Sequence, residues 1–245
     1  QLKTDRLSRI GRWLHARRLL MNQLKKPHCV ITAGPTYESL DQVRRLTNFS
    51  TGSLGAQLSG FLRSKGFYVT LLTGHYTTYE GIFDADRRIP FTTTEDLAGK
   101  LRDLSKHHTD AIFHAAAVSD FTFGKIWERS ERGEMKAINS GKISTRSGTL
   151  LAELVPTPKI LAELRNWYPK ALIGGWKYEV EGSTKQTNEK ALQQLASCNT
   201  DICVLNGPSV GEGFEVFSRK KPNPTKILNR QNLFEHLWKS LENSV

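Results

Sequence analysis

Cysteine is scarce in this chain of 245 residues, which contains only Cys29, Cys198 and Cys203. An odd number of scattered thiols without a Cys-x-x-Cys pair argues against a disulfide framework and against a structural zinc site. Free thiols are typical of proteins kept in a reducing compartment, so we expect a cytoplasmic protein. The chain also lacks an apolar run long enough to span a membrane, and no signal peptide is visible, so we expect no membrane partner.

The sequence also lacks the marks of a dinucleotide-binding reductase. The loop after the first expected strand has no Gly-x-Gly-x-x-Gly run, and no tyrosine is followed by a lysine four positions later. The acid that would bind a ribose after the second strand is missing, since Thr73, Gly74 and His75 stand there. An NAD(P)-dependent reductase of the short-chain type therefore stays an alternative against which these absences argue.

Positive charge is abundant but unevenly distributed. Residues 1–28 contain eight Lys or Arg and one acid, so +7 of the net charge of +11 lies there. We therefore treat residues 1–27 as a basic N-terminal extension, with a helix expected at 5–24. Nucleic-acid binding would depend on this extension alone, and we expect no nucleic-acid partner. The mildly basic remainder fits a site for an anionic metabolite.

A polar stretch from Gly34 to Gly55 follows the short apolar run Cys29–Ala33, which is typical of a buried strand. A helical spacing of apolar residues begins where the stretch ends, so the order is strand, loop and helix. In a parallel sheet such a loop leaves the carboxyl end of the strand, where α/β proteins bind ligands. Glycines admit close backbone approach, arginines supply charge, and the helix N-terminus offers free N–H groups. The loop therefore predicts a site for a phosphorylated ligand.

Strands and helices alternate along the rest of the chain. Further strands are expected at 67–73, 88–91, 110–117, 171–177 and 201–205, and helices at 53–65, 94–107, 157–168, 187–198 and 232–241. Thr93 or Thr94 would cap the second of these helices, and Pro158 would occupy the first turn of the third. This order predicts an α/β fold, a doubly wound, mostly parallel sheet with helices on both faces, as one domain from 28 to 245. Residues 121–155 break the rhythm and predict an irregular excursion with a β-ribbon, and 215–228 predict a hairpin.

Three further segments lie at expected strand ends, namely Ala115–Asp120, Gly174–Lys177 and Leu205–Gly207. Their small residues would leave backbone groups open to a flat base, and Asp120 would meet a ribose or a magnesium ion. Each segment alone is a weak signal. An isolated Asp is more often a turn acid, and Trp176 alone is more often a core residue.

The motifs taken in order resemble the phosphopantothenoylcysteine synthetase family, most closely its free-standing form. The matching pieces are ITAGPT at 31–36, DxVRxxxNxSTGxxG at 41–55, AAAVSDF at 115–121, KIS at 142–144, TPKIL at 157–161, GGWK at 174–177, and Asn206. The resemblance covers about residues 28–240.

The resemblance implies a Rossmann-like ligase that does not bind NAD. Such an enzyme would join 4′-phosphopantothenate to cysteine through an acyl nucleotidylate in coenzyme A biosynthesis, as a homodimer, with CTP or ATP, with magnesium and without flavin. It makes Lys142 and Asn48 the catalytic candidates, and Arg44, Asn48 and Asn206 the substrate-binding candidates. The nucleotide-binding candidates that it implies are Gly34, Ser50, Gly52, Gly55, Ala117, Asp120, Trp176 and Lys177, with Asp120 also the metal ligand.

Two positions depart from the pattern of the family. Gly207 stands where the family commonly has an acid, which keeps a non-catalytic nucleotide-binding protein as an alternative. Trp176 stands where the family usually has phenylalanine, and its larger ring leaves the choice between CTP and ATP open.

Overall fold

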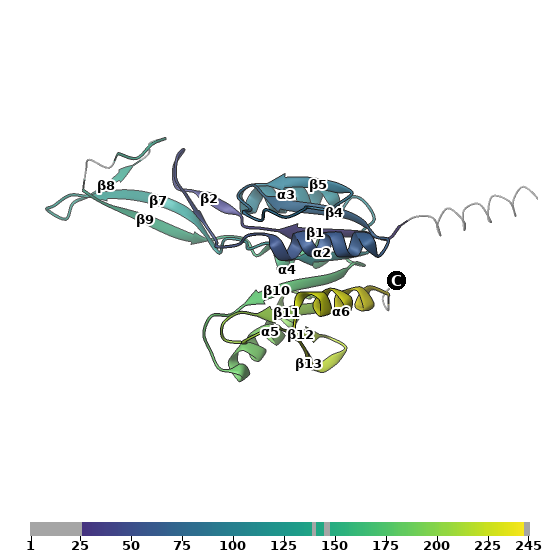
Figure 1. The fold of residues 1–245 in the computed structure, drawn as a ribbon. Helices are drawn as coiled ribbons and strands as arrows, with labels where there is room; N and C mark the ends of the chain where they lie inside the picture. Colours follow the sequence, from purple (N-terminus) through teal and green to yellow (C-terminus); the bar gives the residue numbers. More distant parts are fainter. Residues whose placement is uncertain (1–25, 139–140, 145–147, 243–245) are drawn as a thin grey trace, which may run out of the picture.

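An eight-stranded sheet forms the centre of the computed structural model, which describes residues 26–138, 141–144 and 148–242. The strand order is β13-β12-β11-β10-β6-β1-β4-β5 (Figure 1). The strands from β11 to β5 pair in parallel, and β12 and β13 add an antiparallel edge. The bounds are β1 (His28–Ala33), β4 (Tyr68–Gly74), β5 (Arg87–Phe91), β6 (Ala111–His114), β10 (Leu172–Tyr178), β11 (Ile202–Asn206), β12 (Phe214–Ser218) and β13 (Lys221–Ile227).

Helices cover both faces of this sheet, because successive side chains of each strand enter different cores. Ile31 and Phe113 belong to one buried cluster, and their neighbours Val30 and Ile112 belong to the other. The first cluster is covered by α2 (Ser53–Ser64) and α6 (Arg230–Glu242). The opposite face is covered by α3 (Thr94–Leu104), α4 (Ile160–Trp167) and α5 (Thr184–Ser197). The predicted doubly wound α/β fold is confirmed.

The helices α3 and α5 each begin directly after a side chain that caps them. Thr93 caps α3 by accepting from the Asp96 N–H, as predicted. The start predicted for α5 was three residues late, since Ser183 and Gln186 form a capping box that begins the helix at Thr184.

The predicted start of α4 was wrong. The helix begins at Ile160, so Pro158 lies before it rather than in its first turn. Thr157 does not cap the helix either. Its N–H donates to the Asp120 carbonyl over 2.9 Å, and its hydroxyl donates to the Ser119 carbonyl. Thr157 therefore fastens the start of α4 to the loop after β6.

The stretch from Gly34 to Gly55 contains a hairpin, where the sequence predicted only a loop. Its strands are β2 (Tyr37–Ser39) and β3 (Arg45–Thr47). Three residues are too few to show an alternating pattern. The Arg45 guanidinium lies 3.3 Å from the centre of the Tyr76 ring, so a cation–π contact holds the hairpin against the loop after β4.

Residues 121–156 form an arm that projects from the sheet (Figure 1). Its antiparallel strands are β7 (Phe121–Arg129), β8 (Met135–Ile138) and β9 (Thr149–Pro156), with β7 in the middle. The predicted β-ribbon is confirmed, and β8 adds a strand that was not predicted. The hairpin strand β2 lies against β7, so the arm and the hairpin are neighbours.

Two further sequence-based expectations concern the termini and the thiols. The helix expected at 5–24 lies outside the described residues. Among the helices that the structure does describe, none is long and apolar enough to cross a membrane.

The three cysteines are free and buried. Burial raises the pKa of Cys29, and it raises the pKa of Cys203 to about 12, so neither thiol is a candidate nucleophile.

Candidate active site

The sheet reverses its winding between β1 and β6, which are adjacent and parallel. The chain after β1 proceeds through α2 to β4 on one side, whereas the chain after β6 proceeds to β10 on the other. The crevice at such a switch point is where open α/β sheets bind ligands. The loops after β1 and β6 meet there. Thr36 N–H donates to the Ala117 carbonyl over 3.1 Å, and Ala117 N–H donates to the Gly34 carbonyl over 3.0 Å.

Thr36 locks these two loops together from inside the protein. Its side chain is fully buried, and its hydroxyl accepts from the Ser119 N–H over 2.8 Å and donates to the Ser119 hydroxyl over 3.2 Å. A buried hydroxyl with several partners has a single stable orientation. Thr36 therefore fixes the position of Ala117 and Asp120 relative to the loop after β1.

Glycines bring the loop after β1 close to the start of α2. Gly34 has φ +84° and Gly52 has φ +80°, and a Cβ on Gly52 would lie 3.3 Å from the Gly34 Cα. Gly52 is also the N-cap of α2 and provides no side-chain hydrogen bond to the helix. The Thr51 hydroxyl accepts from the Ser53 N–H over 3.2 Å, and no N-cap side chain covers the other N–H groups of the first turn, which lie beside the switch point. Ser50 lies two residues before this N-cap and is half-buried.

Gly55 presses α2 onto the end of β1. A Cβ there would lie 2.6 Å from the Ala33 Cβ and 3.0 Å from the Thr32 carbonyl oxygen. The predicted candidates Gly34, Ser50, Gly52 and Gly55 thus lie around one helix N-terminus, which is a suitable place for phosphate groups.

Asn48 connects the loop after β1 to the loop after β6. Its Nδ2 donates to the Ala117 carbonyl over 3.3 Å and to the Val118 carbonyl over 3.0 Å. The side chain is exposed, and its two amide hydrogens are accounted for by these carbonyls. The amide oxygen remains as the group through which Asn48 would contact a substrate amine.

Arg44 is engaged with the chain itself. Its guanidinium forms an ion pair with Asp41 at 3.2 Å and donates to the Ile143 carbonyl. The candidate Lys142 precedes Ile143 and is exposed, so Arg44 holds the segment that carries Lys142. The resemblance made Arg44 a substrate-binding candidate, whereas these contacts favour support of the segment 141–144.

The glycines of the segment Gly174–Lys177 in β10 are buried, whereas the sequence predicted that their backbone is open to a ligand. Gly174 and Gly175 are buried, and a Cβ on them would lie 2.7 Å from the Phe113 ring and 2.8 Å from Leu161. Their small size therefore serves core packing, whereas we expected them to leave the backbone open to a base. Trp176 is half-buried and packs edge-on against Phe113, and its buried Nε1 has no partner among the described residues.

Lys177 points to the opposite face of the sheet from Trp176, because the two are successive residues of a strand. Its ammonium lies 3.3 Å from the Glu179 carboxylate, which also pairs with Lys190. Burial opposes ionisation of Glu179, yet the hydrogen bonds and charges of Lys190 and Lys177 outweigh it and lower its pKa. Lys177 is therefore held in an ion-pair network around the buried Glu179 carboxylate at the carboxyl end of β10.

Asn206 ends β11, and its carbonyl accepts from the Glu179 N–H over 2.9 Å. Gly207 follows with φ +127°, and a Cβ there would lie 2.3 Å from the Glu179 carbonyl oxygen. Two loops therefore touch at a position that admits only glycine. This contact gives a packing reason for the missing acid.

Asp120 is exposed at the end of the loop after β6. Among the described residues, no group of three or more His, Cys, Asp or Glu is arranged to hold a metal ion. Magnesium is commonly bound through one or two carboxylates together with the phosphates of a nucleotide. A single exposed carboxylate on the loop after β6 fits that kind of site and does not fit a metal held by protein ligands alone.

His114, at the end of β6, was not singled out from the sequence. It is buried, its Nδ1 lies 2.9 Å from the Thr32 hydroxyl, and burial lowers its pKa to about 4. The neutral ring belongs to the support beneath the switch point. A single histidine within an apolar strand gave no signal that could have identified it.

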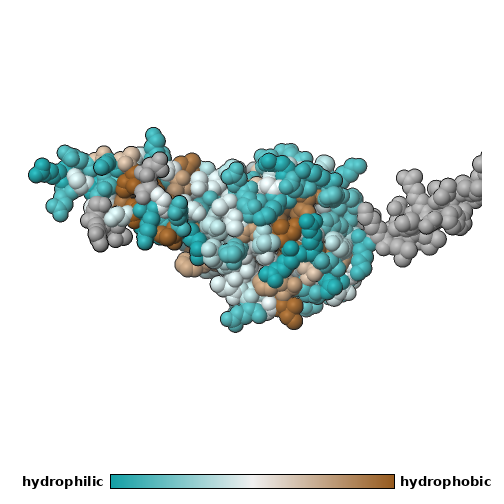
Figure 2. Space-filling model, turned by 90° about the horizontal axis from the view of Figure 1, so that it is seen from above, coloured by the Kyte–Doolittle hydropathy of each residue, from teal (hydrophilic) through white to brown (hydrophobic). Residues whose placement is uncertain are grey.

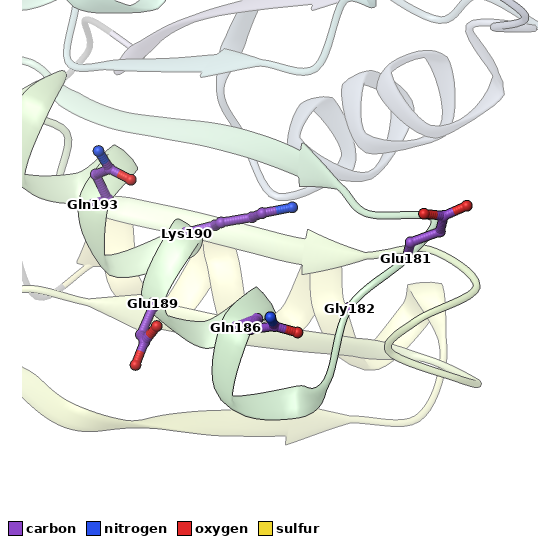
Figure 3. A pocket seen from close by; sticks show the side chains of 6 residues that line it. All are labelled: Glu181, Gly182, Gln186, Glu189, Lys190 and Gln193. Atoms are coloured by element: carbon purple, nitrogen blue, oxygen red, sulfur yellow. The ribbon is translucent and has the colours of Figure 1, made fainter.

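A separate polar hollow of about 430 Å³ lies at the start of α5 (Figure 3). The side chain of Lys190 extends across it, and Glu181 lies on the loop at its rim. None of the predicted site residues lines this hollow. It therefore adds nothing to the site at the switch point.

Comparison with known proteins identifies a family that covers most of the chain. Residues 24–240 match the family model of the DNA/pantothenate metabolism flavoprotein C-terminal domain. The chain is 28% identical to the coenzyme A biosynthesis bifunctional protein CoaBC of Thermococcus kodakarensis, over 92% of this chain and 53% of that protein. It is 30% identical to CoaBC of Bacillus subtilis, over 78% of this chain and 43% of that protein. The chain thus spans about half the length of the curated relatives it matches.

Solved structures share the same fold. The DNA/pantothenate metabolism flavoprotein from Streptococcus pneumoniae superposes with a TM-score of 0.76 at 23% identity, over 89% of this chain and 99% of that one. A Cab2 variant in complex with phosphopantothenate-cysteine superposes with a TM-score of 0.70 at 20% identity, over 92% of this chain and 88% of that one.

Proposed function

The chain belongs to the family of the DNA/pantothenate metabolism flavoprotein C-terminal domain, and on that premise we propose that it is a phosphopantothenate–cysteine ligase. Residues 28–245 would form its single ligase domain. The relatives named as coenzyme A biosynthesis proteins and the neighbour that binds phosphopantothenate-cysteine support this proposal. The observation that carries it is the meeting of Asn48, Ala117 and the N-terminus of α2 at one switch point.

The proposed reaction has two steps. An oxygen of the 4′-phosphopantothenate carboxylate attacks the α-phosphorus of CTP or ATP, which forms an acyl nucleotidylate and releases pyrophosphate. The cysteine amine then attacks the acyl carbonyl, the nucleoside monophosphate leaves, and the amine loses a proton as the amide forms. Bringing a carboxylate to a phosphate joins two anions, so the first step requires positive charge in the crevice.

The residues at the switch point, together with Lys142 on the arm, would supply what these steps need. The N–H groups at the start of α2, beside Gly34 and Gly52, would bind the phosphates. Lys142 would neutralise charge at the α-phosphate, and the Asn48 amide oxygen would orient the attacking amine. Asp120 would bind the ribose or hold magnesium, which, when bound, offsets phosphate charge.

Ala117, at the switch point, would contact the base together with the Trp176 ring. Trp176, Lys177 and Asn206 lie farther along the same edge of the sheet, and Asn206 would contact the substrate. Lys177 would add positive charge from the Glu179 network. We propose that the reaction runs in the cytoplasm, where the three free thiols stay reduced.

The test is pyrophosphate release with phosphopantothenate, cysteine and magnesium, run with CTP, ATP, GTP and UTP in turn. We expect release with CTP or ATP. Lys142→Gln should slow the release by about 10²–10³-fold, the usual effect of removing one charge-stabilising group. Lys170→Gln, at an exposed lysine just before β10 and thus at the other end of that strand, is the matched control and should keep the wild-type rate. Absence of release with every nucleotide would refute the ligase and favour the non-catalytic alternative.

The role of Asn48 is tested by measuring the second step, the transfer of the acyl group to cysteine. Asn48→Asp should allow pyrophosphate release but slow the appearance of phosphopantothenoylcysteine, because a carboxylate cannot donate to the Ala117 and Val118 carbonyls. Unchanged overall turnover in this variant would contradict the role given to Asn48.

We propose that the ligase is a homodimer and that the arm forms the interface. Large apolar side chains of the arm are exposed, and Figure 2 shows hydrophobic atoms gathered along it: Phe121, Met135, Leu151, Leu154 and Val155. The described residues of the arm contain five basic and four acidic side chains, so their charges nearly cancel on a chain of net charge +11. A nearly neutral, mixed and partly apolar surface fits a second copy of itself better than a nucleic acid.

Light scattering coupled to size exclusion tests this interface. Leu154→Glu would place a charge in the dimer contact and should shift the protein to a monomer. Leu228→Glu, at an exposed leucine outside the arm, is the matched control and should leave the dimer intact. A monomeric wild-type protein at micromolar concentration would contradict the proposal.

A further inference from the structure

The segment that carries Lys142 is fastened to the turn Asp41–Arg44 by main-chain hydrogen bonds. Ile143 N–H donates to the Asp41 carboxylate over 3.2 Å, and the Arg44 guanidinium donates to the Ile143 carbonyl. Gln42 N–H donates to the Gly141 carbonyl over 2.9 Å. The Ile143 side chain is 3% exposed, so it is buried beneath this contact. These contacts join residues about 100 positions apart, and we call them the Asp41 clip.

Asp41 is the centre of the clip. One carboxylate oxygen accepts from the N–H groups of Val43, at 2.9 Å, and Arg44, at 2.7 Å. The other accepts from the Ile143 N–H and pairs with the Arg44 guanidinium at 3.2 Å. A carboxylate has about four acceptor positions, and these four contacts occupy them. Asp41 therefore has no capacity left for a ligand, and its role is to organise the chain.

The negative charge of Asp41 is retained by its surroundings. Burial opposes ionisation, but the N–H groups of Val43, Ile143 and Arg44 and the positive charge of Arg44 outweigh it and lower the pKa of Asp41. The carboxylate is inaccessible to solvent. An ionised, fully bonded carboxylate gives the clip a single geometry across the neutral pH range.

The same turn also fixes the other half of the site. It leads into β3 and then to Asn48, whose amide binds the carbonyls of Ala117 and Val118. One continuous stretch of about eight residues, 41–48, therefore bonds to the arm at one end and to the loop after β6 at the other. The position of Lys142 relative to the switch point depends on this stretch.

We propose that Asp41 is a positioning residue that places the Lys142 ammonium to neutralise charge at the α-phosphate, acting through the main chain of Ile143. The proposal rests on the role proposed above for Lys142. Because Ile143 is fixed by both its N–H and its carbonyl, the backbone direction of its neighbour Lys142 is fixed with it. Loss of the carboxylate frees the Ile143 N–H and leaves the Arg44 guanidinium without its anion.

Two variants and one control test the clip. Asp41→Ala removes all four acceptor contacts, and Asp41→Asn keeps the shape but replaces one acceptor oxygen by an NH2 group that opposes the Ile143 N–H and Arg44. Asp103→Asn removes a carboxylate of an exposed ion pair on α3 and serves as the control. Unfolding midpoints show whether each variant is folded, and Asp41→Asn serves if Asp41→Ala is not.

The first readout is independent of activity. Hydrogen exchange of the peptide that contains residues 141–144 should become at least tenfold faster in the Asp41 variants than in the wild type and in Asp103→Asn. The second readout is pyrophosphate release. Its kcat should fall at least tenfold in the Asp41 variants, whereas the KM for the nucleotide, which binds at the start of α2, should stay within twofold. A purely structural defect would instead raise exchange throughout the chain.

The outcomes separate the clip from the proposed function. Unchanged exchange at 141–144 in a folded Asp41 variant would overturn the clip. Faster exchange with a wild-type kcat would overturn the positioning role. A wild-type protein that releases no pyrophosphate would refute the ligase itself and with it the positioning of Lys142 for catalysis, and the exchange result would still show whether Asp41 holds the segment.

Discussion

Gly55 offers a direct measurement of how closely α2 must approach β1. In the variant Gly55→Ala, the new Cβ would lie 2.6 Å from the Ala33 Cβ and 3.0 Å from the Thr32 carbonyl oxygen. Both atoms belong to a buried strand and cannot rotate away, so the helix itself must shift outward. Gly99 in α3 is the matched control, because a Cβ there has nothing within 4 Å.

The two variants should change stability in opposite directions. Alanine favours a helix interior over glycine by about 1 kcal/mol, so Gly99→Ala should stabilise the protein by roughly that amount. Overpacking a well-packed contact costs about 1–3 kcal/mol, and a Cβ–Cβ distance of 2.6 Å against a fixed strand points to the upper half of that range, about 2–3 kcal/mol, so after the helix gain Gly55→Ala should destabilise by about 1–2 kcal/mol. The two free energies of unfolding should therefore differ by about 2–3 kcal/mol.

Urea unfolding followed by circular dichroism measures both variants against the wild type. The shift of α2 should also displace the N–H groups at its start, so the KM for the nucleotide should rise in Gly55→Ala and stay unchanged in Gly99→Ala. A Gly55→Ala protein at least as stable as the wild type would refute the reasoning, since the helix would then have room that the geometry denies.

Three further predictions concern buried groups. Thr36→Val removes the acceptor of the Ser119 N–H and should cost about 1–3 kcal/mol in the free energy of unfolding, whereas Val at the exposed Thr78 should change it by less than about 0.5 kcal/mol. Burial lowers the pKa of His114 to about 4, so His114 of the unfolded chain becomes protonated at a higher pH than His114 of the folded chain. The free energy of unfolding should therefore fall by up to roughly 3 kcal/mol as the pH drops from about 6.5 to 4. In a series of unfolding curves measured across this pH range, His114→Gln should remove most of that fall. Gly207→Asp, which supplies the acid common in the family, should lower the melting temperature and leave turnover no higher, because its Cβ would meet the Glu179 carbonyl oxygen.

The fold and the strand ends that carry the site could be predicted from the sequence because they depend on local pattern. The apolar run Cys29–Ala33 and the run that became β6 are short, buried and followed by small or polar residues, as strands of a parallel sheet should be. The structure then shows that these two strands are neighbours, which brings their following loops together at Gly34 and Ala117.

The contacts that organise the site could not be predicted in the same way. The hydrogen bond between Asp41 and Ile143 joins residues 102 positions apart, and nothing in either neighbourhood specifies the other. The cation–π contact of Arg45 with Tyr76 depends on a hairpin whose strands are too short to read. Gly207 was interpreted as a missing ligand because the close approach of the Glu179 carbonyl oxygen arises only in the tertiary structure.

The root of the arm has a consequence for how chains of this kind can vary. Phe121 and Pro156 are paired directly in the antiparallel sheet, and the Thr157 N–H donates to the Asp120 carbonyl over 2.9 Å. The chain therefore leaves the body and returns to it at almost the same point. An insertion or deletion in β7 and β9 leaves that spacing unchanged, so the length of the arm is constrained by the contacts of residues 141–143 with Asp41–Arg44 and not by the connection between β6 and α4.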